Sequence, residues 1–341
     1  MVFGIAYNEP VTGSYAFSQS SADVLDQVKA VEEALITLGH EAVRIPFTRD
    51  LARFTGSIRE KRIEAVFNLC ETVDEDPTLA GHPAAVLEVA GIAFTGSPSH
   101  AITTTTDKVT AKRLLRAMGL STPDYMIYPG SGHFNVSCLR FPVIIKPRFE
   151  DASIGIDQES VCTSETELKG AVGDFFARFG TLLIEEYIEG REFNVSLFGY
   201  PDLAVLPPAE IDFSRLPGHL HRIVGYRAKW DTTSIEYEAT PRVFPKNLPA
   251  GLAGELAAVA RQCAHLFGLR DYGRVDVRVD DRGRIYVLEV NANPCLTPDA
   301  GFASACREAD MPYAAMVDGL VQFVCTRMDT NDTASCPAGQ G

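Results

Sequence analysis

The first third of the chain alternates short apolar runs with stretches in which apolar residues recur every three or four positions. The short runs suit buried strands, and the recurring spacing suits amphipathic helices that pack on them. Parallel strands need helical crossovers, so this alternation predicts a small parallel sheet covered by helices. The apolar runs are residues 2–7, 42–45, 64–69 and 92–94, and the helical stretches are 24–38 and 84–90. We expect them to form a first domain over residues 1–102.

The pattern changes after residue 102. A hydroxyl-rich segment, 103–106, is predicted to be a loop, and the basic segment DKVTAKRLLRAMGL after it is predicted to be a helix that ends near Gly119. Two apolar segments, FPVIIKP and TLLIEEYIEG, then bracket the loop RFEDASIGI and a polar helix over 165–178. Strands that enclose a loop and one helix predict a small α+β lid, which we place at residues 103–190.

The remaining pattern predicts a third domain over residues 191–328. Strands in FNVSLFG, LAVLP and RIVGYRA precede a long helix over 252–267, a hairpin and a terminal amphipathic helix over 313–324. The polar segment 329–341 offers no apolar anchors for a core and is predicted to be a disordered tail. The expected fold class is therefore mixed, with an α/β first domain followed by α+β domains.

The segment GRVDVRVDDRGRIYVLEVNANP, residues 273–294, is predicted to be a β-hairpin that turns within DDRG. With an even number of loop residues, Asp276 would lie opposite Val287. The two-residue period of a strand would then place Glu289 and Asn291 on the face of Asp276. Two carboxylates and an amide are oxygen ligands of the kind that magnesium prefers. The alternative is that they form the solvent-facing side of an amphipathic hairpin.

Charge and composition narrow the range of partners. The formal net charge of -14 opposes binding to a phosphate backbone, and Lys and Arg do not cluster among aromatic residues, so nucleic acid is not expected as a partner. No apolar run is long enough to cross a bilayer, and no basic segment precedes the first apolar residues as in a signal peptide. Its 8 cysteines form no CxxC pair, which argues against a zinc site or a disulfide framework. We expect a cytoplasmic protein that does not enter a membrane.

Several motifs occur in a set order along residues 60–327. They are AGIAFTGSPSHAITTTTDKVTAKRLLRAMGLSTP, FPVIIKPRFEDASIGI, LLIEEYIEGREFNVSLFG, YRAKW, GRVDV and LEVNANP. This series resembles the ATP-grasp superfamily, specifically its D-alanine–D-alanine ligase branch. The resemblance implies a three-domain ATP-grasp fold and an enzyme that joins a small-molecule acid to an amine through an acyl phosphate. It also implies ATP and two magnesium ions as cofactors, with manganese as a substitute, and a homodimer formed through the first domain.

The resemblance assigns roles at the centre of the reaction position by position. Asp276, Glu289 and Asn291 match the family's metal ligands. Lys229, in YRAKW, matches a lysine near the γ-phosphate, and Arg274 matches an arginine that neutralises the acyl phosphate. A fixed guanidinium beside developing negative charge is worth about 3 to 4 kcal/mol of transition-state stabilisation. Both cations are therefore expected to be catalytic.

The resemblance also assigns the nucleotide site. Glu185 matches the residue at the adenine edge, and Glu192 matches an acceptor of hydrogen bonds from the ribose hydroxyls. An ionised carboxylate suits a ribose because it only accepts hydrogen bonds. The small residues of EDASIGI match a loop whose backbone N–H groups approach the phosphates. The expected nucleotide contacts are Lys108, Lys146, Ser153, Glu185, Glu186, Tyr187, Ile188 and Glu192.

The substrate positions depart from the family pattern. The family's serine in the phosphate-covering loop is Ala152 here, and the tyrosine after the lysine of YRAKW is Trp230. The first loop, NEPVTGSYAFSQ, does not match the family's GGxSxE pattern. Cys295 stands where glycine is usual, and Ala300 replaces a serine that holds the carboxylate of the amine substrate. We therefore expect a product other than D-alanyl-D-alanine.

An acidic segment, NLCETVDEDP, replaces a histidine-glycine segment of the family and brings Glu71 to the expected substrate mouth. Acidic residues there would favour a cationic amine, although a charged loop that faces water explains the segment equally well. The expected substrate contacts are Glu71, Trp230, Cys295 and Ala300. Three alternative functions stay open: an intramolecular amide-forming cyclase, a phosphotransferase on the same fold, and a catalytically silent ATP-binding scaffold.

Overall fold

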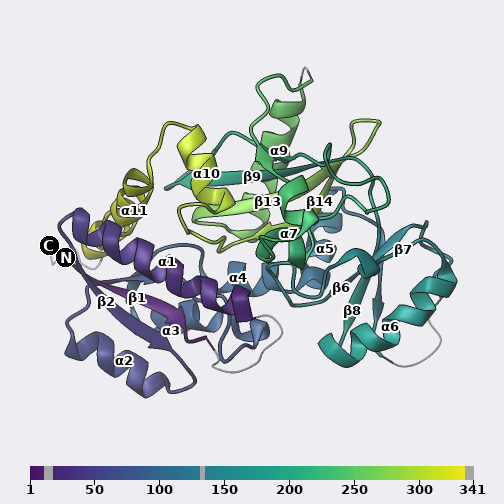
Figure 1. Cartoon of the computed structure of the whole chain (residues 1–341). Coiled ribbons are helices and arrows are strands. Elements are labelled where there is room, and N and C mark those ends of the chain that lie inside the picture. The colour runs from purple at the N-terminus through teal and green to yellow at the C-terminus, as the bar shows by residue number, and fades with distance from the viewer. Residues whose placement is uncertain (11–17, 131–134, 250, 335–341) are drawn as a thin grey trace, which may run out of the picture.

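The computed structural model describes residues 1–10, 18–130, 135–249 and 251–334 (Figure 1). Within these residues three sheets follow one another along the chain, and each is packed against helices. The strands of the first sheet lie within residues 2–94, those of the second within 125–186 and those of the third within 191–291. None of the helices formed by these residues has the length and apolar character that a membrane crossing requires.

The first sheet is parallel and has the strand order β2-β1-β3-β4. Its strands are β1 (Val2–Asn8), β2 (Glu41–Phe47), β3 (Ala65–Asn68) and β4 (Ala93–Phe94). Its helices are α1 (Ser18–Thr37), α2 (Leu51–Glu60) and α3 (His82–Ala90), with a short 3-10 helix η1 (Pro77–Leu79) before α3. In β1, Phe3 shares a buried cluster with Val31 of α1, whereas Ala6 belongs to a second cluster with Phe54 of α2. Alternate side chains thus bury both faces of the sheet.

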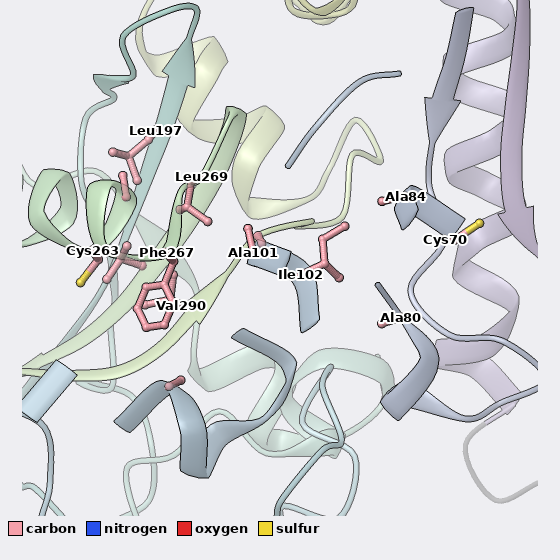
Figure 2. Close-up of a cluster of buried hydrophobic side chains, with 14 of the residues drawn as sticks. Cys70, Ala80, Ala84, Ala101, Ile102, Leu197, Cys263, Phe267, Leu269 and Val290 are labelled. Carbon is pink, nitrogen blue, oxygen red and sulfur yellow. The ribbon is translucent and has the colours of Figure 1, made fainter. Parts of the chain in front are cut away.

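Two helices connect the first sheet to the rest of the molecule: α4 (Ser99–Thr106) and α5 (Lys108–Ala117). The loop predicted at residues 103–106 is wrong, because these residues complete α4. The hydroxyls of Thr104, Thr105 and Thr106 donate to carbonyl groups four residues earlier, as Thr104 Oγ1 does to His100 O at 2.6 Å, so they are satisfied within the helix. Figure 2 shows Ala101 and Ile102 of α4 in a buried cluster that reaches from the first sheet to the third.

The second sheet, on the right of Figure 1, is antiparallel with the order β5-β8-β6-β7. Its strands are β5 (Tyr125–Tyr128), β6 (Val143–Pro147), β7 (Val161–Cys162) and β8 (Leu182–Glu186). Helix α6 (Glu165–Phe179) covers one face, and the short 3-10 helix η2 (Gln158–Ser160) precedes β7. Leu168 and Phe175 of α6 are buried against Ile145 and Ile184 of the sheet. This sheet and α6 lie within residues 103–190, and Ile144 and Val161 on the other side of the sheet are buried with Ile223.

The third sheet has the order β12-β11-β9-β13-β14, with β10 paired to β9. Its strands are β9 (Arg191–Gly199), β10 (Ala204–Val205), β11 (Ala209–Ile211), β12 (Arg242–Val243), β13 (Asp271–Val279) and β14 (Ile285–Asn291). Its helices are α7 (Tyr226–Trp230), α8 (Ile235–Ala239), α9 (Leu252–Phe267), α10 (Gly301–Glu308) and α11 (Tyr313–Ala334). Helix α11 packs through Leu320 on α1 and continues past residue 328, where the tail was expected to begin. Residues 335–341 of that predicted tail lie outside the described residues.

Strand β13 separates the core of the third sheet from the site. Val275, Val277 and Val279 are buried with Phe267 of α9, which Figure 2 shows beside Val290 of β14. The intervening side chains, those of Arg274, Asp276 and Arg278, lie on the opposite face and line a cavity. The alternation of the sequence VDVRVD therefore positions polar groups where the lid covers the sheet.

Candidate active site

A cavity of about 790 Å³ lies between the lid sheet and the third sheet. The predicted site residues that line it are Glu71, Lys146, Ser153, Glu185, Glu186, Tyr187, Ile188, Glu192, Lys229, Trp230, Arg274, Asp276, Glu289, Asn291, Cys295 and Ala300. A smaller cavity of about 80 Å³ shares Glu71, Asp151 and Glu289 with it, and Lys108 lines this second cavity. The structure thus gathers all the predicted residues around two adjoining cavities.

The hairpin places Asp276 directly opposite Glu289 and Arg274 opposite Asn291. The expected pairing of Asp276 with Val287 is wrong, because the register shifts after Asp276 and Val287 pairs with the next residue of β13 instead. This β-bulge leaves one extra residue in β14. Asp276, Glu289 and Asn291 still lie on one face of the hairpin, because the bulge comes before Glu289 in β14.

The donor set at this hairpin fits a magnesium ion only in part. No set of three or more His, Cys, Asp or Glu side chains in the described ranges is arranged to hold a metal by itself. The chain offers the carboxylates of Asp276 and Glu289 and the amide oxygen of Asn291. Magnesium at nucleotide sites commonly takes one or two carboxylates and completes its octahedron with phosphate oxygens and water. The residues present therefore fit a metal that binds together with a nucleotide.

Arg274 and Asp276 form an ion pair inside the cavity. Arg274 donates from Nε and Nη2 to the two carboxylate oxygens of Asp276 at 2.8 and 2.9 Å, and Asn194 Nδ2 donates to Asp276 Oδ1 at 2.8 Å. Burial acts to lower the pKa of Arg274, but the attraction of Asp276 outweighs it, so the pKa lies above its usual value. The guanidinium is therefore a permanent positive charge, oriented by two bonds.

Asp151, in the loop after β6, lies beside the predicted metal ligands and was missed from the sequence. Asn291 Nδ2 donates to Asp151 Oδ2 at 3.2 Å, and Lys108 Nζ lies 3.9 Å from Glu289 Oε1. Burial raises the pKa of Glu289, and Asp151 raises it further. Burial also acts to raise the pKa of Asp151, but Lys108 and Lys229 outweigh it and lower that pKa. This corner combines carboxylates that suit a cation with lysines that suit phosphate groups.

The other end of the cavity contains a buried carboxylate between two lysines. Glu185 of β8 is 1% exposed, with Lys146 Nζ 3.2 Å from Oε2 and Lys112 Nζ 3.3 Å from Oε1. Burial acts to raise the pKa of Glu185, but the two lysines outweigh it and lower that pKa. Burial lowers the pKa of Lys112 to about 8. Lys112 was missed because its amphipathic helix gave no sign of a partner on a distant strand.

The segment 186–188, at the end of β8, offers fewer free backbone N–H groups than the sequence analysis expected. The amide N–H of Glu186 donates to Asp124 O at 2.8 Å, and that of Tyr187 donates to Pro142 O at 2.9 Å. The Glu186 carboxylate accepts hydrogen bonds from Arg140 as well. Any backbone N–H contact with a nucleotide from this segment is therefore expected at Ile188.

Glu192, the predicted ribose contact, is bonded to an arginine that was missed from the sequence. Arg278 donates from Nε and Nη2 to Glu192 Oε2 at 3.1 and 2.8 Å, and from Nη1 to Ile188 O at 2.8 Å. Arg278 is 3% exposed and Glu192 is 8% exposed. Both bonds from Arg278 to Glu192 end on one oxygen, Oε2, so they orient the carboxylate and leave its second oxygen, Oε1, available. The two-residue period of β13, which puts Arg278 on the face of Asp276, was the signal for it.

The loop after β6 is attached to the segment that carries Lys229. Ala152 and Ser153 have φ angles of 54° and 61°, in the left-handed region. Trp230 Nε1 donates to Ala152 O at 3.0 Å, and Ser153 Oγ donates to Val224 O at 2.7 Å. Trp230 therefore contacts the loop through a backbone carbonyl, although the family's tyrosine and serine are both absent. Lys229 is exposed on α7 beside this contact.

The end of the cavity that holds the predicted substrate contacts Glu71 and Cys295, called the substrate end below, is acidic. Asp23 of α1 and Glu71 after β3 both contact Gln27, whose Nε2 donates to Glu71 Oε1 at 2.9 Å and to Asp23 Oδ2 at 3.4 Å. Burial raises the pKa of Glu71 to about 7 and also raises the pKa of Asp23. Asp23 and Gln27 had no signal in the sequence, because their helix reads as ordinary core packing. Most of the departing first loop, residues 11–17, lies outside the described residues.

Cys295 and Ala300 also lie at the substrate end, in the segment between β14 and α10. The Cys295 thiol donates to Asp23 Oδ2 at 3.1 Å. Burial raises the pKa of Cys295 well above its usual value, and Asp23 and Glu71 raise it further, so the thiol stays protonated. It is therefore a weak nucleophile and a polar contact. Ala300 precedes α10 and provides no side-chain cap for it.

The three sheets and the lid-covered cavity define an ATP-grasp fold. The family model described as D-ala D-ala ligase C-terminus matches residues 114–322. The chain belongs to this family of ATP-dependent carboxylate–amine ligases. The predicted family, fold class and class of enzyme are thereby confirmed.

Individual relatives agree with this assignment. The D-alanine–D-alanine ligase of Carboxydothermus hydrogenoformans is 29% identical over 304 residues, which cover 86% of this chain and 91% of that protein. A Sinorhizobium fredii protein named Uncharacterized protein y4sG is 32% identical over 257 residues, covering 75% of this chain and 73% of that protein. The crystal structure of the Bacillus anthracis D-alanine–D-alanine ligase complexed with ATP has a TM-score of 0.76 at 22% identity, covering 97% and 99% of the two chains. At that identity the likeness shows the fold.

Proposed function

We propose that this protein uses ATP to activate an amino-acid-like carboxylate as an acyl phosphate and couples it to an amine, releasing ADP and phosphate. One observation carries the proposal. Arg274, Asp276, Glu289 and Asn291 lie on one face of a hairpin, across a cavity from Lys146 and Glu185 of the lid. A paired arginine, oxygen donors and lysines around one space suit phosphoryl transfer from a nucleotide.

The nucleotide would lie under the lid. We assign the adenine edge to Glu185 and the backbone of Ile188, and the ribose to Glu192, whose carboxylate Arg278 holds in place. Lys146 and Lys108 would neutralise the phosphates, and the loop at Ala152 and Ser153 would cover them. Asp276, Glu289 and Asn291 would hold one or two magnesium ions, with manganese as a substitute. Magnesium held by these residues would neutralise negative charge on the phosphates of the nucleotide.

The reaction follows from the poor reactivity of a carboxylate toward amines. A substrate carboxylate oxygen attacks the γ-phosphorus, and the bond from that phosphorus to the ADP oxygen breaks. The amine nitrogen then attacks the acyl carbon, phosphate leaves with the carbon–oxygen bond pair, and the nitrogen loses a proton. Arg274 would stabilise the negative charge on the acyl oxygen, and Lys229 would stabilise that on the transferred phosphoryl group. The lid excludes water that would hydrolyse the acyl phosphate.

The two substrates proposed here differ from a pair of D-alanines. Ala300 and Cys295 stand where the family resemblance expects serine and glycine, and Asp23 and Glu71 make the substrate end acidic. These differences support an acid substrate or an amine substrate other than D-alanine. An intramolecular version, in which one molecule carries both groups and closes a ring, uses the same residues.

The test is release of ADP and phosphate from magnesium-ATP in the presence of pairs of L- and D-amino acids and small amines. Release that requires both an acid and an amine supports the ligase, and release with one compound alone indicates ring closure. Phosphorus NMR distinguishes free phosphate from a phosphorylated product, which would indicate a phosphotransferase. Bound ATP without release across the panel would indicate a silent scaffold and overturn the proposal.

A further inference from the structure

Lys112, on the buried face of α5, is a cation that the reaction described above does not use. Its side chain is 1% exposed, and it lines neither of the two cavities formed by the described residues. It therefore makes no direct contact with what those cavities bind. A lysine in such a position costs free energy unless its charge is paired and hydrogen-bonded. The partners of Lys112 thus indicate its role.

The ammonium group of Lys112 has two partners on different elements. Lys112 Nζ donates to Thr122 Oγ1 at 2.7 Å and lies 3.3 Å from Glu185 Oε1. Thr122 Oγ1 in turn donates to Val287 O of β14 at 2.8 Å. Because the hydroxyl hydrogen of Thr122 is used on Val287, the lone pairs of that oxygen are left for Lys112. The hydrogen-bonded chain from β14 thus fixes the ammonium beside Glu185.

Glu185 consequently has one lysine at each carboxylate oxygen. Lys146 Nζ lies 3.2 Å from Oε2 on the cavity side, and Lys112 lies at Oε1 outside the cavity. Burial acts to raise the pKa of Glu185, but the attraction of Lys112, followed by that of Lys146, outweighs it. The carboxylate is therefore ionised, and an ionised carboxylate accepts hydrogen bonds but donates none. Glu185 presents a fixed acceptor to the cavity.

A fixed acceptor beside a lysine distinguishes between purine bases. Adenine presents an amino donor next to an acceptor nitrogen, whereas guanine presents two acceptors on the same edge. Glu185 and Lys146 together complement the adenine edge, and the carboxylate repels the carbonyl oxygen of guanine. A protonated or rotated Glu185 would lose this distinction. Selection of the base therefore depends on the group that keeps the carboxylate ionised and oriented.

We propose that Lys112 is a positioning residue that makes the nucleotide site select adenine over guanine. It holds the Glu185 carboxylate ionised and oriented from outside the cavity, without touching the nucleotide. This inference rests on the adenine contact assigned to Glu185 in the proposed function, and it adds the residue that sets the choice of base.

The experiment measures Kd for magnesium-ADP and magnesium-GDP by calorimetry in the wild type, Lys112→Met and Thr122→Val. Loss of a hydrogen bond to a charged acceptor predicts that Lys112→Met weakens ADP binding about ten- to a hundredfold. GDP binding should change little, so the preference for ADP should shrink by the same factor. Thr122→Val keeps the shape of the side chain but removes the hydroxyl that orients Lys112, and should reduce the preference less. Lys169→Met, which loses only an exposed pair with Glu165 on α6, is the control.

A double variant tests whether Lys112 acts through Glu185. In a Glu185→Gln background the side chain carries no charge to hold, so adding Lys112→Met should leave the remaining preference unchanged. A further loss of preference there would contradict the proposal. Equal losses of ADP and GDP affinity in Lys112→Met would also overturn it, because general loosening of the lid affects both nucleotides. If Lys112→Met does not fold, Thr122→Val decides, and an unchanged preference in that variant would overturn the proposal.

Nucleotide binding needs neither an acid nor an amine, so failure of the ligase function gives a different result. If no compound causes phosphate release but Lys112→Met still reduces the preference for ADP, the ligase proposal fails and the role of Lys112 stands. If the wild type binds ADP and GDP equally well, Lys112 does not select the base, whatever the reaction. A wild type that binds neither nucleotide would overturn both proposals.

Discussion

The two ends of the cavity differ in how their charges are compensated. At the end proposed to bind the nucleotide and metal, three charged pairs link side chains of the protein: Lys146 with Glu185 at 3.2 Å, Arg278 with Glu192 at 2.8 Å and Arg274 with Asp276 at 2.8 Å. At the substrate end Asp23 and Glu71 share the neutral Gln27, and Arg242 also lines the cavity. The first end is preorganised, whereas the second keeps charge that a substrate would neutralise. Binding energy at the second end therefore depends on which substrate enters.

The largest effect should come from the metal face. Glu289→Gln keeps the shape of the side chain but removes the negative charge, and the loss of one charge-stabilising group in a closed site predicts a decrease in kcat of about a thousandfold. ADP release at saturating ATP measures it. Because burial and Asp151 already disfavour the charge of Glu289, the folded state should be no less stable to urea. Asp281→Asn, exposed in the turn of the same hairpin, is the control, and retained turnover in Glu289→Gln would remove the metal assignment.

The next effect tests whether the nucleotide end is held together by its pairs. Arg278→Met would leave the buried carboxylate of Glu192 without its partner, and breaking such a pair costs about 3 to 5 kcal/mol of unfolding free energy. Urea denaturation measures the loss. Arg278→Met combined with Glu192→Leu should recover much of it, because two apolar side chains leave no buried charge. A double variant as unstable as the single one would show that packing of Arg278, and not its charge, stabilises this end.

A smaller effect, of opposite sign, is expected at the substrate end. Burial raises the pKa of Glu71 to about 7, above the usual carboxyl value of 4.5. Between these values the folded state holds a proton that the unfolded state has lost, so stability falls as pH rises through the window. Glu71→Gln, which stays neutral, should therefore be more stable than the wild type by about 1 to 3 kcal/mol near pH 8. The gain should shrink toward zero below pH 4.5.

Chemical denaturation across this pH range measures the difference, and Glu60→Gln, at the exposed end of α2, controls for the loss of a surface carboxylate. A gain that does not change with pH would mean that the substrate end does not leave Glu71 in an unfavourable environment. The carboxylate of Glu71 would then be as well compensated as those at the other end of the cavity.

The two ends of the cavity also differ in how well the sequence predicted their residues. The hairpin face was predicted because strand period and residue chemistry coincide at Asp276, Glu289 and Asn291, and the pairing failed only at a bulge, which has no marker such as glycine. The hydroxyl-rich residues 103–106 were misread because threonines that satisfy themselves within a helix resemble those of a loop. Residue periodicity therefore predicted the strands and their faces, but it did not predict the β-bulge or the helical threonines.

Residues at the substrate end could not be found by local rules. Asp23 and Cys295 are hydrogen-bonded although 272 positions separate them, and Gln27 contacts Glu71 across 44 positions. Such neighbours arise from the packing of α1 against the segment after β14, which no short pattern encodes. Lys112 was missed for the same reason, since its partner Glu185 lies on a different element. Arg278 differs, because the alternation of β13 was enough to place it.

The smallest effect concerns Trp230, which the sequence analysis assigned to substrate. Its indole donates to Ala152 O at 3.0 Å and so attaches the phosphate-covering loop to α7, beside Tyr226. Trp230→Phe keeps an aromatic ring there but removes the donor. A net hydrogen bond is worth about 1 kcal/mol, so KM for ATP should rise about fivefold with kcat nearly unchanged. Initial rates of ADP release at varied ATP measure this.

The second hydrogen bond that attaches this loop gives a companion variant to Trp230→Phe. Ser153→Ala removes the bond from Ser153 Oγ to Val224 O at 2.7 Å, and should raise KM for ATP by a similar factor. Because both bonds hold one loop, the double variant should deviate from the product of the two single effects. An increase in KM for the amine in Trp230→Phe, with KM for ATP unchanged, would instead place Trp230 at the substrate end. The phosphate-covering loop at Ala152 and Ser153 would then border the substrate end of the cavity at Trp230.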